Sequence, residues 1–244
     1  MHQQFSPMKP LQTYNVLVKV FLLTGMVFFS ACGGDNIVKE KPPSLTGIEK
    51  ILLLPFKDMA SVFGESANGR CPVCGKVFTA GELAEGAAAM LTERLFILLK
   101  DRKDIELIPS SQAQGVMSGL LAESNETVQE RDFQLEIGRA LNADAIFAGY
   151  IYRFRERIGG EYSVDLPASV AFDIHLIRVE DGRVLWSAHF DETQLPLSDD
   201  LFRLGLFLRR KAKWITAKEM AISGLEDMLK DFSVPAKTET LENR

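Results

Sequence analysis

Two cysteines, three positions apart, are the residues of this chain whose type and spacing most clearly suggest chemistry. Cys71 and Cys74 lie in the sequence Cys-Pro-Val-Cys-Gly, where the proline and the glycine favour a tight turn. Such a turn aims both sulfur atoms at one point, so the two thiolates are suited to bind a single metal ion. The remaining cysteine, Cys32, lies in a different kind of sequence.

The sequence leaves three interpretations of the cysteine pair open. A structural zinc site needs four ligands, so Cys71 and Cys74 would form half of a site that is completed by His175 and His189 or by the same pair of a second subunit. A disulfide is the simpler alternative outside the cytoplasm. A catalytic thiol would need a lowered pKa, commonly at the start of a helix, and Cys74 lies about five residues before the next predicted helix.

A predicted β-hairpin carries a second candidate cluster. Apolar and polar residues alternate on both sides of a turn within residues 170–190. A three-residue turn that ends at Gly182 keeps each face of the hairpin consistent, and it places Asp173 opposite His189, with His175 diagonal on the same face. These residues are a metal-binding fragment, a base with its orienting group, or a polar contact on a half-exposed sheet, which is the commonest case.

A third candidate is a basic run that follows a predicted helix over residues 198–208. It consists of Arg209, Arg210, Lys211, Lys213 and Trp214. The run either binds anionic lipid headgroups, with the tryptophan at the membrane interface, or places cations at the negative end of the preceding helix.

The elements that must position these residues alternate along the chain. Their order, β-α-β-α-α-β-β-β-α-α, predicts an α/β (α+β) fold with a mixed sheet of about five strands and packed helices. Ser/Thr-x-x-Glu patterns predict helices that start at Thr79, Thr127 and Thr216, the first ending near Lys100. Residues 57–78 are predicted to be a long loop. The predicted strands are 51–56, which is expected in the centre of the sheet, 105–109, 145–152, 170–176 and 184–190.

The first 31 residues predict a signal peptide. Lys9 and Lys19 precede an apolar segment, residues 20–29. This segment has about half the length that a membrane-spanning helix needs, as in a signal peptide. Without residues 1–31 the chain keeps 26 basic and 33 acidic residues, a formal charge of −7, which disfavours a nucleic-acid partner. Either Met1 or Met8 is the start.

At Phe29-Ser30-Ala31-Cys32 the sequence resembles a bacterial lipoprotein, with Phe29 where that family usually has leucine. The resemblance implies cleavage before Cys32 and a covalent lipid, with acyl chains such as palmitate, on that cysteine. Several acyl chains anchor a protein stably. Gly33 stands where an aspartate would retain the protein in the inner membrane, so the resemblance implies an outer-membrane, lipid-anchored protein that faces the periplasm.

The expected domain organisation follows from these features. Residues 1–31 form the signal peptide, and residues 32–47 the lipidated cysteine with a flexible tether rich in Gly, Pro and charge. Residues 48–233 form a single periplasmic domain, and residues 234–244 a disordered tail.

Across residues 48–233 the order of motifs resembles the periplasmic domain of the curli secretion channel lipoprotein (CsgG), the lipoprotein activator of penicillin-binding proteins (LpoB) and the TolB N-terminal domain. The motifs are residues 51–56, the helix after Thr79, and residues 107–111, 143–149 and 179–186. The resemblance implies a non-enzymatic domain that binds envelope proteins. The curli channel has membrane hairpins between its strands, whereas residues 154–169 of this chain are short and charged.

The sequence therefore predicts a lipid-anchored binding or assembly module that recruits or activates protein partners, with no catalytic residues and no small-molecule substrate. No phosphate-binding loop, His-Glu-x-x-His or Gly-x-Ser-x-Gly motif occurs in it. The alternative is a homo-oligomeric component of a secretion or surface-fibre assembly without membrane hairpins of its own. An enzyme or redox protein that uses Cys71 and Cys74 is the third hypothesis.

Overall fold

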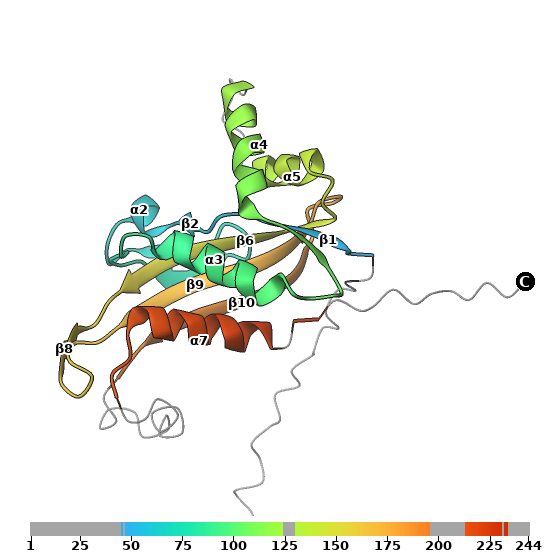
Figure 1. The fold of residues 1–244 in the computed structure, drawn as a ribbon. Helices are drawn as coiled ribbons and strands as arrows, with labels where there is room; N and C mark the ends of the chain where they lie inside the picture. The colour runs from blue at the N-terminus through green and yellow to red at the C-terminus, as the bar shows by residue number, and fades with distance from the viewer. Residues whose placement is uncertain (1–44, 46, 124–129, 196–212, 231, 234–244) are drawn as a thin grey trace, which may run out of the picture. The chain divides into compact units, whose positions relative to one another are not determined.

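The computed structural model describes residues 45, 47–123, 130–195, 213–230 and 232–233 (Figure 1). The predicted signal peptide, Cys32, the cap at Thr127, the helix over 198–208 and the C-terminal tail lie outside the described residues. The elements in chain order are β1 (Lys50–Leu53), β2 (Lys57–Asp58), α2 (Ala60–Phe63), β3 (Asn68–Arg70), β4 (Val77–Thr79), α3 (Ala87–Leu99), β5 (Glu106–Ile108), α4 (Ser110–Glu123), α5 (Glu130–Ala140), β6 (Ala145–Arg155), β7 (Ile158–Gly159), β8 (Val164–Leu166), β9 (Ser169–Arg178), β10 (Val184–Thr193) and α7 (Ala217–Leu229).

The main sheet is mixed and six-stranded, in the order β10-β9-β6-β1-β5, with the short β2 also paired to β6. Strand β1 runs parallel to β5 and β6, whereas β6, β9 and β10 are antiparallel neighbours. The continuous apolar run Ile51–Leu54 is buried on both faces of the sheet, as parallel strands usually are. The predicted fold class is therefore confirmed, and β1 lies inside the sheet between β6 and the edge strand β5.

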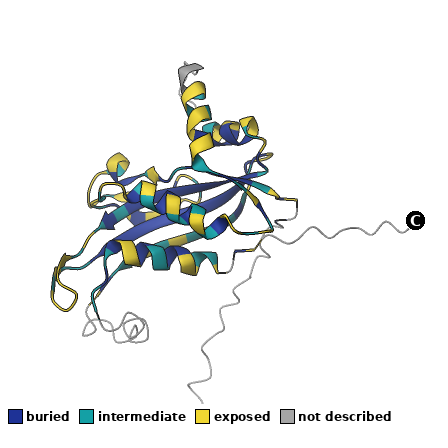
Figure 2. Cartoon of the chain, viewed as in Figure 1, coloured by how far each residue is buried: buried dark blue, intermediate teal, exposed yellow. Residues whose placement is uncertain are grey.

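Two hydrophobic cores lie on opposite faces of the sheet. We call one the helical face, because α3 and α7 pack on it, and the other the hairpin face, because the β3–β4 hairpin covers it together with α4 and α5 (Figure 1). The middle strands β6 and β9 are buried along their length, and exposed residues gather on the outer sides of the helices (Figure 2). Side chains of β9 alternate between the two faces, because successive residues of a strand point in opposite directions.

The predicted register of the β9–β10 hairpin is confirmed. Phe172 pairs with Phe190, and Ala188 pairs with Ile174. Gly182 closes the turn with a φ of 69°, and its amide donates to the carbonyl of Arg178 at 2.9 Å. The predicted three-residue turn is wrong, since Arg178 pairs with Arg183 and four residues lie between them. A bulge between Val184 and Trp186 then restores the predicted register along the rest of both strands.

The predicted start of the first helix at Thr79 is wrong. Thr79 ends strand β4, and α3 begins only after Gly86, which has a φ of 76°. The intervening segment hydrogen-bonds to β6 instead: the amide of Gly81 donates to the carbonyl of Tyr152, and the amide of Ala84 to that of Phe154, both at 3.0 Å. Pairing along a buried strand outweighs the local capping pattern, which contributes only about 1 kcal/mol.

The prediction of one long loop over residues 57–78 is also wrong. This segment contains β2, α2 and the β3–β4 hairpin, and the cysteines lie in the turn of that hairpin. The hairpin is hard to predict because its strands are three residues long and carry a glycine, Gly69. A β-carbon at Gly69 would lie 2.2 Å from the ring of Phe63, so packing rather than strand propensity places this residue.

Two other predictions of local structure are confirmed. The capping box of α7 is formed: Thr216 Oγ1 accepts from the amide of Glu219 at 3.1 Å, and the Glu219 carboxylate accepts from the amide of Thr216 at 2.8 Å. Helix α3 ends at Leu99, next to Lys100, where the sequence predicted its end. In the described part of the chain, no helix has the length and apolar character that crossing a bilayer would require.

Candidate metal centre

Four metal-ligating side chains meet on the hairpin face. Cys71 and Cys74 come from the turn of the β3–β4 hairpin, and Asp173 and His175 come from β9. One potential ligand atom of each residue lies within 4.8 Å of the corresponding atoms of the other three. Cys71, Asp173 and His175 are buried, whereas Cys74 is exposed, so the cluster reaches the surface on the side of the turn.

The turn that carries the cysteines is held by backbone hydrogen bonds. The amide of Cys71 donates to the carbonyl of Lys76 at 2.8 Å, and the amide of Gly75 donates back to the carbonyl of Cys71 at 2.9 Å. The amides of Val73 and Cys74 point at the sulfur of Cys71, at 3.4 and 3.5 Å. The sulfur of Cys71 is thus held inside the turn, and a cysteine binds metal through this atom as the thiolate.

The hairpin is fixed over β6 by aromatic packing. Phe78 of β4 is buried and stacks on Tyr152 of β6, with ring centroids 4.2 Å apart and ring planes 9° from parallel. The ammonium group of Lys76 lies 5.6 Å from the centre of the Phe78 ring. This stack places the cysteine turn directly over the polar residues of β9.

Asp173 and His175 share the hairpin face because they are two residues apart on a strand. Their exposed fractions are 0% and 1%, so the prediction of a half-exposed polar face is wrong for this pair. The hairpin that covers them comes from a part of the sequence about a hundred residues earlier. Buried polar groups of this kind destabilise a fold unless they find partners.

Two of the buried groups, Cys71 and Asp173, contact the same nitrogen of the third, His175. His175 Nε2 lies 3.2 Å from Cys71 Sγ and 3.3 Å from Asp173 Oδ2. Within the described chain, His175 Nδ1 and Asp173 Oδ1 have no hydrogen-bond partner. A Cys-His-Asp catalytic relay needs the carboxylate on the opposite nitrogen from the thiol. Here both contact Nε2, which is the arrangement of ligands around a common centre.

Tyr152 of β6 orients the carboxylate of Asp173 through a hydrogen bond. Its hydroxyl donates to Asp173 Oδ2 at 3.2 Å. Burial, together with the charge of Asp173, raises the pKa of Tyr152, so this hydroxyl keeps its proton and remains a donor. The sequence reasoning missed Tyr152 as part of this cluster, although its alternation with Tyr150 along β6 marks both tyrosines as sharing a face.

The charge state of the cluster depends on His175. Burial acts to lower its pKa, but the hydrogen bonds and charges of Asp173 and Cys71 outweigh burial and raise the pKa of His175 to about 9. Without a metal, the imidazole is therefore protonated at neutral pH and neutralises an anionic neighbour.

His189 does not join the other four residues. The predicted pairing of His189 with Asp173 across β9 and β10 is present, but the side chain of His189 is exposed at the edge of the sheet. Partial burial and the charge of Lys76 lower its pKa. The structure thus brings Asp173 to the cysteines where the sequence analysis expected His189.

Only part of the predicted basic patch can be described. Lys213 Nζ pairs with Glu161 at 3.3 Å, and the amide of Trp214 donates to the carbonyl of Glu161 at 2.7 Å. Arg209, Arg210 and Lys211 lie outside the described residues.

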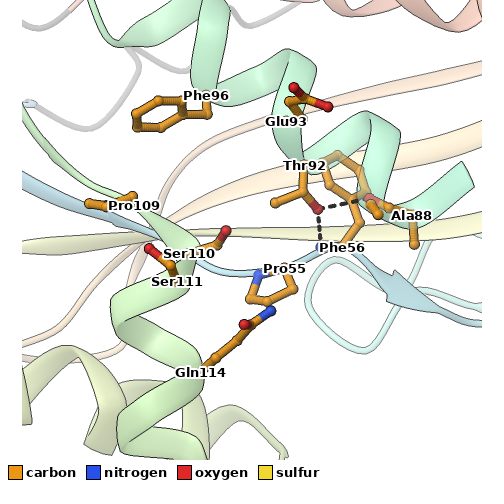
Figure 3. A pocket seen from close by; sticks show the side chains of 11 residues that line it. Pro55, Phe56, Ala88, Thr92, Glu93, Phe96, Pro109, Ser110, Ser111 and Gln114 are labelled. Atoms are coloured by element: carbon orange, nitrogen blue, oxygen red, sulfur yellow. Dashed lines mark hydrogen bonds between the residues drawn. The ribbon is translucent and has the colours of Figure 1, made fainter. Parts of the chain in front are cut away.

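A hollow of about 370 Å³ lies between α3 and α4, at the carboxyl ends of β1 and β5 (Figure 3). Phe56, Phe96 and Pro109 line it, and Thr92 lies at its base. The hydroxyl of Thr92 accepts from the amide of Phe56 at 2.9 Å and donates to the carbonyl of Ala88 at 2.8 Å. The surface of the hollow is mainly apolar, although Glu93, Ser110, Ser111 and Gln114 also line it.

Comparisons with known proteins give distant likenesses only. No family model matches the chain, and no curated protein matches it. Among solved structures, the PelC dodecamer from Paraburkholderia phytofirmans is 16% identical, with a TM-score of 0.37 over 80% of this chain and 94% of that chain. The LpoB C-terminal domain from Salmonella enterica is 16% identical, with a TM-score of 0.36 over 61% and 87%.

Lipoprotein GNA1162 from Neisseria meningitidis is 12% identical, with a TM-score of 0.37 over 67% of this chain and 98% of that chain. LpoB is one of the proteins that the sequence resembles. At these identities and TM-scores, the likenesses carry no argument about what this chain binds or does.

Proposed function

We propose that this chain is a lipid-anchored, non-enzymatic module of the bacterial cell envelope that binds protein partners on the periplasmic side of the outer membrane. The observation that carries the proposal is the sequence Phe29-Ser30-Ala31-Cys32 after a short apolar segment. Gly33 after the cysteine supports the outer membrane over the inner membrane as the destination.

The length of the tether limits where the domain acts. Thirteen residue steps separate Cys32 from Leu45, the first described residue. A fully extended chain spans at most about 3.5 Å per residue, so Leu45 lies within roughly 45 Å of the lipid anchor. Partners would therefore be proteins in, or close to, the same membrane surface.

The anchor is tested by substitution of the lipidated residue. Cells that express the full chain are labelled with palmitate, and membranes are separated by density. We expect the wild-type protein to carry label and to fractionate with the outer membrane, and Cys32→Ala to carry none. Labelling that persists in Cys32→Ala, or an unlabelled wild-type protein, would refute the anchor.

A second candidate function is that of a homo-oligomeric component of an envelope assembly. Strand β10 favours it, because within the described residues this ten-residue strand has a partner, β9, on one side only. An open strand edge is a template for pairing with another chain, including an identical one.

Site-specific crosslinking in intact cells distinguishes the two functions. A photo-reactive residue is placed at Ser187, which is exposed on β10, and at Lys218, which is exposed on α7, as the matched control. An adduct between two copies from Ser187 alone supports the oligomer, and light scattering of the detergent-extracted protein then gives its mass. An adduct with a different envelope protein supports the binding module.

A further inference from the structure

We propose that Cys71, Cys74, Asp173 and His175 of a single chain bind one Zn²⁺ ion that fastens the β3–β4 hairpin to strand β9. The set has the number and the types of ligands that structural zinc sites use. Two thiolates and an imidazole also favour zinc over magnesium or calcium, which prefer oxygen ligands.

The distances between the ligand atoms are compatible with a tetrahedral zinc site. Ligand atoms that lie 2.0–2.3 Å from zinc at the corners of a tetrahedron are about 3.3–3.8 Å from one another. Two of the separations in the cluster, 3.2 Å from His175 Nε2 to Cys71 Sγ and 3.3 Å from His175 Nε2 to Asp173 Oδ2, are close to that range. With all four atoms within 4.8 Å of one another, small side-chain rotations complete the tetrahedron.

Neighbouring groups already orient two of the four ligand atoms. The amides of Val73 and Cys74 donate to the sulfur of Cys71, and the hydroxyl of Tyr152 orients the carboxylate, as outer partners of metal ligands commonly do. Two thiolates and one carboxylate leave a net charge of −1 around Zn²⁺. The ion therefore neutralises most of a charge cluster that is otherwise buried among apolar residues.

The site is closed, since all four positions are taken by protein. It thus has a structural role: the metal joins two segments that are 104 positions apart in the sequence, counted from Cys71 to His175. A disulfide between Cys71 and Cys74 would consume both thiolates, so the oxidised pair and the zinc site exclude each other.

The first experiment measures metal in the full chain, extracted in detergent from cells. We expect one zinc per chain by elemental analysis, and an X-ray absorption spectrum with two sulfur and two nitrogen or oxygen ligands. Less than about 0.1 zinc per chain, with a mass 2 Da low for a disulfide, would overturn the proposal. Half a zinc per chain would also overturn it, because the site would then be shared between two copies.

Substitutions identify the ligands by the spectrum of Co²⁺ exchanged into the protein. Cys74→Ser, Asp173→Asn and His175→Gln are each expected to weaken metal binding at least about 10-fold and to change the cobalt bands. His189→Gln is the matched control, since His189 is the nearby histidine outside the cluster, and it is expected to bind as the wild type does. Loss of binding in His189→Gln with retention in Asp173→Asn would refute the proposed ligand set.

Wild-type protein supplies a test that does not depend on how variants fold. Removal of zinc with a chelator should accelerate amide hydrogen exchange in residues 68–79, while the amides of α3 and α7 keep their protection. Uniform exchange in both regions, or no change in the hairpin, would contradict a metal that fastens this hairpin.

Discussion

The two faces of the sheet are stabilised by different means, although the same strands supply both. On the helical face, β9 presents Val170, Phe172, Ile174 and Leu176 to α3 and α7, and this core is apolar. On the hairpin face, the same strand presents Asp173 and His175, which are equally buried. Apolar contacts are non-directional and tolerate adjustment, whereas buried charges are stable only with specific partners.

The largest effect is expected on the helical face. Phe172 is fully buried, 6.2 Å from the ring centre of Phe56 and 5.4 Å from that of Phe190. Phe172→Ala should lower the free energy of unfolding by about 4 kcal/mol, because it removes a large side chain and leaves a cavity. Urea unfolding measures this loss. Ser187→Ala, at an exposed position, is the control, and a loss below about 1 kcal/mol in Phe172→Ala would contradict the account.

On the hairpin face, His175→Leu alone should lower the free energy of unfolding more than His175→Leu combined with Asp173→Leu. In the metal-free, reduced protein, His175→Leu leaves Asp173 buried without its cation, and we expect a loss of about 3 kcal/mol. Adding Asp173→Leu removes the unpaired buried carboxylate, so the double variant should recover about 2 kcal/mol of that loss. A double-mutant cycle by urea unfolding checks this, and additive losses would show that the two residues do not act as a pair.

The tyrosine hydroxyls of β6 give a finer comparison within the hairpin face. Tyr152→Phe keeps the stack on Phe78 but removes a hydrogen bond to a charged group, so a loss of about 2 kcal/mol is expected. Tyr150→Phe is the matched variant: its hydroxyl accepts from the neutral amide of Gln134 at 3.0 Å, so about 1 kcal/mol is expected. Equal losses would argue against an ionised Asp173 beneath the hairpin.

The smallest effect concerns the capping box of α7, on the helical face. Glu219→Ala, which removes the carboxylate that accepts from the Thr216 amide, should cost about 1 kcal/mol at neutral pH. The backbone hydrogen bond from Thr216 lowers the pKa of Glu219, so the stabilisation is present above the ordinary glutamate pKa and is lost as the pH falls through the lower, folded value. Thermal unfolding between pH 7 and pH 3 should show the variant and the wild type converging in acid. A constant difference would contradict this linkage.

Sequence patterns were reliable where the deciding interactions lie within a few residues. The α7 capping box joins positions three apart, and the β9–β10 register follows the alternation of apolar and polar residues with a period of two. The Cys-Pro-Val-Cys-Gly turn belongs to the same class, since the backbone of residues 71–76 forms it locally. The sequence by itself thus determined the mixed sheet, the turn that pairs the cysteines, and the face that Asp173 and His175 share.

Only the tertiary structure decided which residues meet. Thr79 has the sequence of a helix start, yet the chain from Gly81 to Ala84 pairs with β6. Cys71 meets His175 and Asp173, and not His189, because the Phe78–Tyr152 stack sets the hairpin over the middle of β9 and not over the edge strand. The closure of a segment of about a hundred residues depends on the sum of many weak contacts, and no local pattern encodes that sum.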